Sequence, residues 1–144
     1  MYLLNQANQA VRSQLEAALR DLQVTGIQYT ILSIVDQHEG ISSAELSRRF
    51  FVTAQTMNEI INGLELRGLI ARTEDPANRR IRCMKLTGRG RKLFNKCENI
   101  ADRVEEAAFD WLAPKEHQAL RESLRSLLWG LRERRRKQWH CDAT

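Results

Sequence analysis

Two groups of residues have the chemistry and spacing for contact with nucleic acid. The first is a set of amide and hydroxyl side chains on the expected exposed side of a helix over residues 54–67: Gln55, Thr56, Asn58 and Asn62. Such groups hydrogen-bond to base edges and phosphate oxygens. The second is a set of arginines in a polar segment beyond that helix: Arg79, Arg80 and Arg82. Guanidinium groups are attracted by the negative potential of a minor groove. The two groups together predict a DNA-contacting surface, and the pattern leaves open which side chain meets a base and which a phosphate.

Four further residues lie next to these groups. Ser43, Arg48 and Arg49 belong to a shorter helix that is expected to end near residue 49, and all three are candidates for phosphate contact. For the adjacent Arg48 and Arg49, the alternative is that one of them bridges to a surface carboxylate. Thr53 is the expected N-cap of the helix over 54–67, because its hydroxyl accepts from backbone N–H groups of the first turn.

The elements that position these residues form a helix-turn-helix followed by a β-wing. Apolar spacing predicts a helix over Gly26–His38, with Thr25 as its N-cap, ahead of the two helices already named. Alternation of apolar and polar residues then predicts two short strands, Ile70–Glu74 and Ile81–Leu86. The turn-forming Asp, Pro and Asn residues between them predict a wing over residues 75–81. Ile41 is expected to add one rung to this sheet.

Long amphipathic helices are expected on both sides of this lobe, over residues 1–22, over residues 88–112 and from Pro114 onward. Their apolar residues recur at spacings of three and four, which makes narrow stripes; the last helix carries Leu120, Leu124, Leu127 and Leu131. A narrow stripe finds few partners within one small domain, so a symmetric dimer is expected to cover it.

The expected fold class is therefore mainly α with a small β-wing: a winged helix-turn-helix plus long helices that form a dimerisation region. One domain is expected over residues 1–144. Within it, residues 1–24 and 100–144 would form the dimerisation helices, and residues 25–99 the DNA-binding lobe.

The charge distribution agrees with an anionic partner. The chain has a formal net charge of +5 and a pI near 9.5. Eight of its basic residues fall between positions 70 and 92, against two acidic ones, so the positive field is concentrated at and just after the wing. The three cysteines have no metal-binding or disulfide spacing, which indicates a reduced protein. Without a long apolar run, the expected location is cytoplasmic, with no membrane partner.

No set of catalytic residues is recognisable, so an enzyme is not expected. There is no nucleophile elbow and no phosphate-cradling glycine loop, and the three histidines lack metal-ligand spacing; no metal and no cofactor is expected. The alternative function is a winged-helix module for protein–protein contact without DNA specificity. The polar wing sequence favours DNA over that alternative, because a protein-binding wing would expose apolar residues.

Across nearly its full length the chain resembles the MarR family of bacterial transcriptional regulators. The resemblance is carried by LSRRFFVTAQTMNEIINGLELRGLI (residues 46–70) and by DPANRRIRCMKLTGRGRKL (residues 75–93). It implies a homodimer, expected to be a repressor, whose helix 54–67 enters the major groove and whose wing reaches the minor groove of a palindromic operator. By its match to the family position Arg80 is the favoured minor-groove residue, with Asp75 orienting it. Phe51 stands where the family usually has a turn glycine.

The resemblance also implies a small-molecule or redox effector that acts near the junction of the dimerisation and DNA-binding parts. A candidate effector pocket lies between the helices over 1–22, 26–38 and 88–112. Tyr29 and Trp111 are its candidate lining residues, and both fit a purely structural role equally well.

Overall fold

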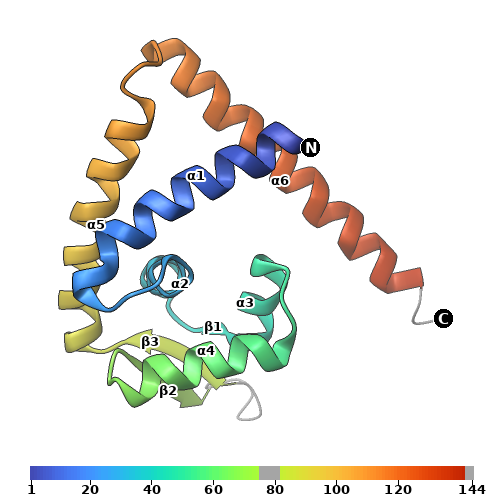
Figure 1. The fold of residues 1–144 in the computed structure, drawn as a ribbon. Coiled ribbons are helices and arrows are strands. Elements are labelled where there is room, and N and C mark those ends of the chain that lie inside the picture. The colour runs from blue at the N-terminus through green and yellow to red at the C-terminus, as the bar shows by residue number, and fades with distance from the viewer. Residues whose placement is uncertain (75–81, 142–144) are drawn as a thin grey trace. The chain divides into compact units, whose positions relative to one another are not determined.

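The computed structural model describes residues 1–74 and 82–141; for residues 82, 132 and 135–141 this description covers the backbone only. Its helices are α1 (Tyr2–Leu19), the single 3₁₀ turn η1 (Arg20–Leu22), α2 (Gly26–Gln37), α3 (Ser43–Phe50), α4 (Ala54–Leu66), α5 (Gly88–Phe109) and α6 (Pro114–Cys141). Its strands are β1 (Ile41–Ser42), β2 (Ile70–Glu74) and β3 (Arg82–Leu86) (Figure 1). The expected fold class, mainly α with a small β-wing, is confirmed.

The chain clusters into two compact units, Met1–Glu105 and Glu106–Thr144. The first contains everything from α1 to most of α5, and the second contains the end of α5 and all of α6. The division into dimerisation helices and a DNA-binding lobe stays a prediction. Within the part of the chain that the structure describes, no helix is both long and apolar enough to cross a membrane.

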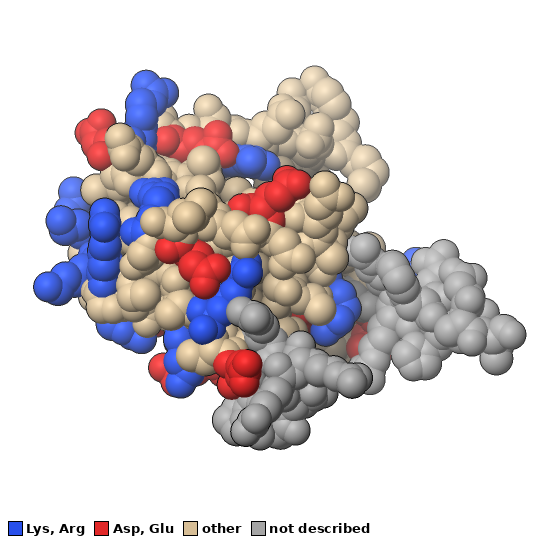
Figure 2. All heavy atoms as spheres, turned by 90° about the horizontal axis from the view of Figure 1, so that it is seen from below, with Lys and Arg blue, Asp and Glu red and all other residues tan. Residues whose placement is uncertain are grey.

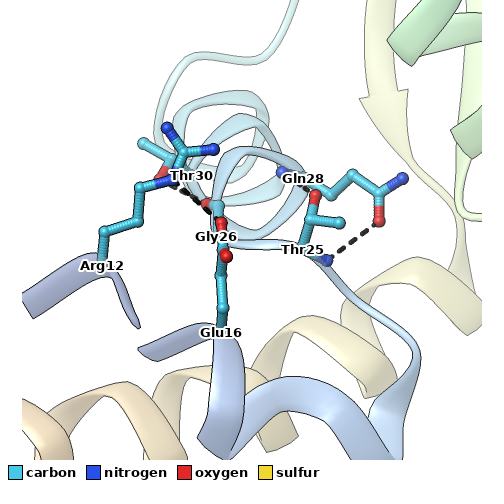
Figure 3. Close-up of polar contacts among 6 residues, drawn as sticks. All are labelled: Arg12, Glu16, Thr25, Gly26, Gln28 and Thr30. Atoms are coloured by element: carbon cyan, nitrogen blue, oxygen red, sulfur yellow. Dashed lines mark hydrogen bonds and ion pairs between the residues drawn. The ribbon is translucent and has the colours of Figure 1, made fainter. Parts of the chain in front are cut away.

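The start of α2 is fixed by a side-chain cap, and it lies against α1. Thr25 caps the helix: its hydroxyl accepts from the backbone N–H of Gln28 at 3.3 Å, and the Gln28 side chain accepts from the Thr25 N–H at 3.1 Å. Figure 3 shows this capping box beside the ion pair of Arg12 and Glu16 on α1. A Cβ added at Gly26 would lie 3.7 Å from both Glu16 and Leu15, so α1 and α2 are in close contact here.

The sheet has the order β1-β3-β2, and both pairings are antiparallel. Ile41 pairs with Met84, which confirms the expected single rung, and Ile70 pairs with Leu86 at the far end of the wing from its tip. One face of this sheet closes the main core, whose buried side chains come from α2, α3, α4, the strands and α5: Ile31, Leu32, Val35, Ile41, Leu46, Met57, Ile61, Leu64, Leu69, Ile70, Met84 and Phe94. A second cluster, Leu19, Val24 and Cys97, joins α1 to α5.

The end of α4, the start of β2 and the start of α5 meet at one tight junction. Gly68 has a φ of +67°, and the bonds from Gly68 N–H to Glu65 O (2.8 Å) and from Leu69 N–H to Leu64 O (3.0 Å) form a Schellman motif. Thr87 N–H donates to the Leu69 carbonyl at 3.1 Å. A Cβ at Gly90 would lie 1.9 Å from that same carbonyl oxygen, so only glycine fits there.

Substituting Gly90 tests this junction. Gly90→Ala should lower the free energy of unfolding by about 2–3 kcal/mol, because the added methyl group overlaps a backbone carbonyl that cannot move away. Gly63→Ala is the matched control: it lies within α4 with nothing within 4 Å of the added Cβ, and should raise stability by about 0.5–1 kcal/mol. Urea unfolding monitored by circular dichroism measures both. Equal effects of the two substitutions would contradict the close contact.

Candidate nucleic-acid interface

Phe51 shapes the turn that joins α3 to α4. Its φ is +56°, a left-handed conformation that glycine adopts most readily, and the backbone N–H groups of Phe51 and Val52 both donate to the carbonyl of Ser47. A side chain in this conformation costs about 1 kcal/mol. The residue at the family's usual glycine position therefore still takes up the conformation that suits glycine.

Thr53 begins α4, as its sequence position predicts. Its hydroxyl accepts from the backbone N–H of Thr56 at 3.1 Å, and the two threonine hydroxyls lie 2.8 Å apart. This cap satisfies one of the free N–H groups of the first turn and defines where the helix starts. It also uses hydrogen-bonding capacity of both threonines within the protein.

The rest of α4 divides into a buried face and an outward ridge. Met57, Ile61 and Leu64 are buried completely. On the opposite side the helical spacing aligns three exposed side chains, Gln55, Glu59 and Asn62. Gln55 Nε2 donates to Glu59 Oε1 at 3.2 Å, which orients the carboxylate along the ridge; Thr56 and Asn58 are exposed on its two flanks.

Arg72 links this ridge to β2, the strand that leads into the wing. One of its guanidinium nitrogens, Nη2, donates to Asn62 Oδ1, and its Nε lies 3.5 Å from Glu65 Oε2. The Arg72 side chain is only 21% exposed, so it is held against α4 rather than extended into solvent. The polar pattern of α4 contained no signal for this contact, because it depends on the pairing of a helix with a strand.

The two candidates on α3 have different surroundings. Ser43 is the first residue of α3 and is half-buried, whereas the cap is Ser42, whose hydroxyl accepts from Glu45 N–H at 3.2 Å. Arg49 Nη2 donates to Glu45 Oε1 at 2.9 Å, so Arg49 is the arginine that bridges to a carboxylate. Its neighbour Arg48 is exposed, so Arg48 stays a candidate for phosphate contact.

The predicted wing contacts lie at the limit of the described residues. Asp75, Arg79 and Arg80 lie outside them, and for Arg82 the structure gives the backbone, paired with Glu74 at the start of β3. The roles assigned to these four residues stay predictions.

The candidate effector residues lie in different compact units. Tyr29 is half-buried and stacks on Phe94, with 6.1 Å between ring centroids. Burial raises the pKa of its phenol above the ordinary value, and the carboxylates of Glu98 and Asp102 raise it further. Trp111 belongs to the second unit, is 75% exposed, and donates from Nε1 to Ala108 O at 2.8 Å. A pocket that uses both residues stays a prediction.

Two observations concern the cysteine and metal-ligand side chains of the described residues. Burial raises the pKa of the Cys97 thiol, an effect that the Arg67 guanidinium partly offsets, so the neutral, unreactive form is favoured. Over residues 1–74 and 82–141, no group of three or more His, Cys, Asp and Glu side chains is placed to hold a metal ion.

Two helices joined by a tight turn, a capped second helix with an outward polar ridge, and a two-stranded wing at its end define a winged helix-turn-helix protein. A sequence profile of the MarR family matches residues 22–81. The HTH-type transcriptional repressor Rv2887 of Mycobacterium tuberculosis is 31% identical over 126 residues, which cover 88% of this chain and 91% of that protein. The chain belongs to the MarR family of winged-helix transcriptional regulators.

Solved structures agree with this assignment. A crystal structure of MarR superposes with a TM-score of 0.82 and 27% identity, covering 94% of this chain and 92% of that one. The transcriptional repressor CouR, bound to a 23-mer DNA duplex, gives a TM-score of 0.80 and 25% identity over 88% and 89% of the two chains. Rv2887 in complex with p-aminosalicylic acid gives 0.72 and 30% over 88% and 95%.

The Thr53 cap can be tested by its contribution to stability. Thr53→Ala should lower the free energy of unfolding by about 1 kcal/mol, because a first-turn N–H of α4 loses its acceptor. Thr53→Ser keeps the hydroxyl and should stay close to the wild-type value. Both variants can be compared by urea unfolding. A Thr53→Ala protein as stable as the Thr53→Ser protein would show that the hydroxyl does not hold the start of α4.

Proposed function

We propose that this protein is a transcriptional repressor that binds a palindromic operator as a homodimer. The helix α4 enters the major groove, and the wing at residues 75–81 reaches the adjacent minor groove. One observation carries the proposal: the ridge of Gln55, Glu59 and Asn62 points directly away from the buried face of a helix whose two ends are both fixed. A polar ridge on a rigid, protruding helix is what reading base edges requires.

The ridge itself indicates that the contact is with bases rather than with phosphates. Glu59 lies between Gln55 and Asn62 on the exposed side of α4, and its carboxylate would repel a phosphate. In the major groove a carboxylate instead accepts from the amino group of cytosine. Phosphate contacts then come from residues beside the ridge, including Arg48 on α3 and the arginines of the wing.

A homodimer is supported by the apolar stripe of α6. Its leucines are 38–47% exposed in the isolated chain: Leu120, Leu124, Leu127, Leu128 and Leu131. A two-fold partner would remove this surface from water, which favours association. In such a dimer the two recognition helices lie about 34–36 Å apart, one turn of B-DNA, and read two half-sites.

Release by a small molecule is part of the proposal. Among relatives of this chain, Rv2887 is named a repressor and has been solved with p-aminosalicylic acid, and CouR has been solved on DNA. By analogy, an effector would bind this protein and lower its affinity for the operator.

The central experiment compares DNA sequences. At physiological salt the purified protein should bind the DNA upstream of its own gene at least about 10³-fold more tightly than a random duplex of equal length. Fluorescence anisotropy measures both affinities. Equal affinities would favour the protein-interaction alternative and reject sequence-specific binding.

A wing substitution tests the minor-groove contact. Arg80→Ala should weaken operator binding by about 1–3 kcal/mol and reduce the slope of log K against log salt by about 1, because one cation leaves the DNA backbone. Arg103→Ala, an exposed arginine of α5 far along the chain from the wing, is the control and should leave both quantities unchanged. The same loss in both variants would mean that only the net charge matters.

The dimer can be tested on α6. Leu124→Glu should shift the protein from dimer to monomer, because it places a charge in the apolar stripe. Ser126→Glu adds the same charge on the opposite side of the helix and should leave the dimer intact. Sedimentation velocity separates the two states. A Leu124→Glu protein that remains a dimer would place the interface elsewhere.

A further inference from the structure

The first compact unit contains a hollow with a basic lining. It lies at the base of the wing, away from the start of α1 and from the ridge of Gln55, Glu59 and Asn62. Its volume is about 300 Å³, within the range of small-molecule sites. Its lining comes from η1 and the residue after it, from the end of α4, and from the first turns of α5: Leu22, Gln23, Arg67, Leu69, Arg89, Lys92, Leu93 and Lys96. Half of these residues are cationic and none is acidic.

The four cations of the hollow lack the carboxylate partners that neighbouring cations have. On nearby positions Arg91 pairs with Asp36 at 2.5 Å, Arg72 with Glu65 at 3.5 Å, and Lys85 with Glu39 at 3.6 Å. Within the described part of the chain, no ion pair involves any cation of the hollow: Arg67, Arg89, Lys92 or Lys96. Figure 2 shows Lys and Arg side chains gathered along the left edge of the molecule, the side on which α5 begins in Figure 1.

One of these cations is oriented by the protein. Arg67 is half-buried, and its Nη1 lies 3.4 Å from the side-chain oxygen of Gln28, the same atom that completes the capping box of α2. The guanidinium is thus held at the wall of the hollow, where an arginine can offer paired donors to an anion. The apolar side chains of Leu22, Leu69 and Leu93 supply a surface for a non-polar part of a ligand.

The hollow lies at the end of α4 opposite to the end that is proposed to contact DNA. Arg67 follows the last residue of α4, whereas Thr53 marks the end that would enter the groove; the 13 residues between them span about 20 Å. Leu69 likewise precedes β2, whose five residues extend about 16 Å toward the wing tip. The phosphates of a duplex bound by the ridge and the wing tip therefore do not neutralise the four cations of the hollow.

We propose that this hollow is a second binding site, for a small phosphate-bearing molecule with an apolar portion. Its phosphate oxygens accept from Arg67 and from the cations of α5, and its apolar portion lies on the leucines. Because the lining joins the end of α4 to the start of α5, the bound anion cross-links the two elements through opposite charge. The site stands independently of the proposed operator binding, since anion binding is measured without DNA.

The test is a titration of the full chain in low-salt, phosphate-free buffer, with inorganic phosphate, pyrophosphate, phenyl phosphate and an acidic polypeptide as separate probes. Isothermal calorimetry should show one site per chain, tighter binding of phenyl phosphate than of inorganic phosphate, and weaker binding as salt rises. Lys92→Gln and Arg89→Gln should each weaken binding about tenfold, whereas Arg103→Gln, on the same helix but outside the hollow, should not.

Three results would overturn the proposal. Absence of binding of any probe at millimolar concentration removes the site, and equal weakening by Arg103→Gln reduces it to general charge attraction. Binding of an acidic polypeptide with no binding of the phosphate probes identifies a protein partner instead. Operator binding by Lys92→Gln provides a separate check: its salt slope should match that of the wild type, and a slope reduced by about 1 would assign Lys92 to the DNA backbone.

Discussion

The contact between Gly90 and the carbonyl of Leu69 is the constraint on which the rest of the winged helix-turn-helix depends. The Leu69 carbonyl also accepts from Thr87 N–H, so one backbone group fixes the end of β3 and the first turn of α5 against the exit of α4. Since Leu69 is itself set by the Schellman motif at Gly68, the direction of α4 and the direction of α5 are determined at the same point. For the proposed reading of DNA, α4 must be held in one orientation, and this junction supplies that rigidity.

The same helix is restrained at three places by different kinds of interaction. Thr53 caps its start, the junction at Leu69 ends it, and Arg72 ties its outer side to β2. Burial of Met57 and Ile61 turns one face of α4 toward the core and so sets its rotation. The polar contacts at Thr53, Leu69 and Arg72 add restraints on its ends and its outer side. The lobe is therefore built so that a small set of outward side chains can have fixed positions.

Local signals in the sequence predicted most of this architecture. The caps at Thr25 and Thr53 and the strand pairing at Ile41 were predicted from the sequence, and each is confirmed. Contacts between distant elements were not predictable in the same way. The bond between Asn62 and Arg72 joins a helix to a strand, and the basic hollow combines three segments. Neither the bond nor the hollow leaves a periodic pattern in the sequence, because each forms only when the elements pack together.

If Asn62 contacts DNA as proposed, its bond from Arg72 also limits which groups it can recognise. An arginine has only donors, so the amide oxygen of Asn62 must face it, and the amide nitrogen must face outward. Asn62 thus presents hydrogens, not a lone pair, to whatever approaches α4. Its complement is an acceptor such as guanine O6 or N7, thymine O4 or a phosphate oxygen, and the two-bond pairing of an asparagine with adenine is disfavoured. In the proposed DNA complex, Arg72 on β2 would thereby determine which side of the Asn62 amide is available to the operator.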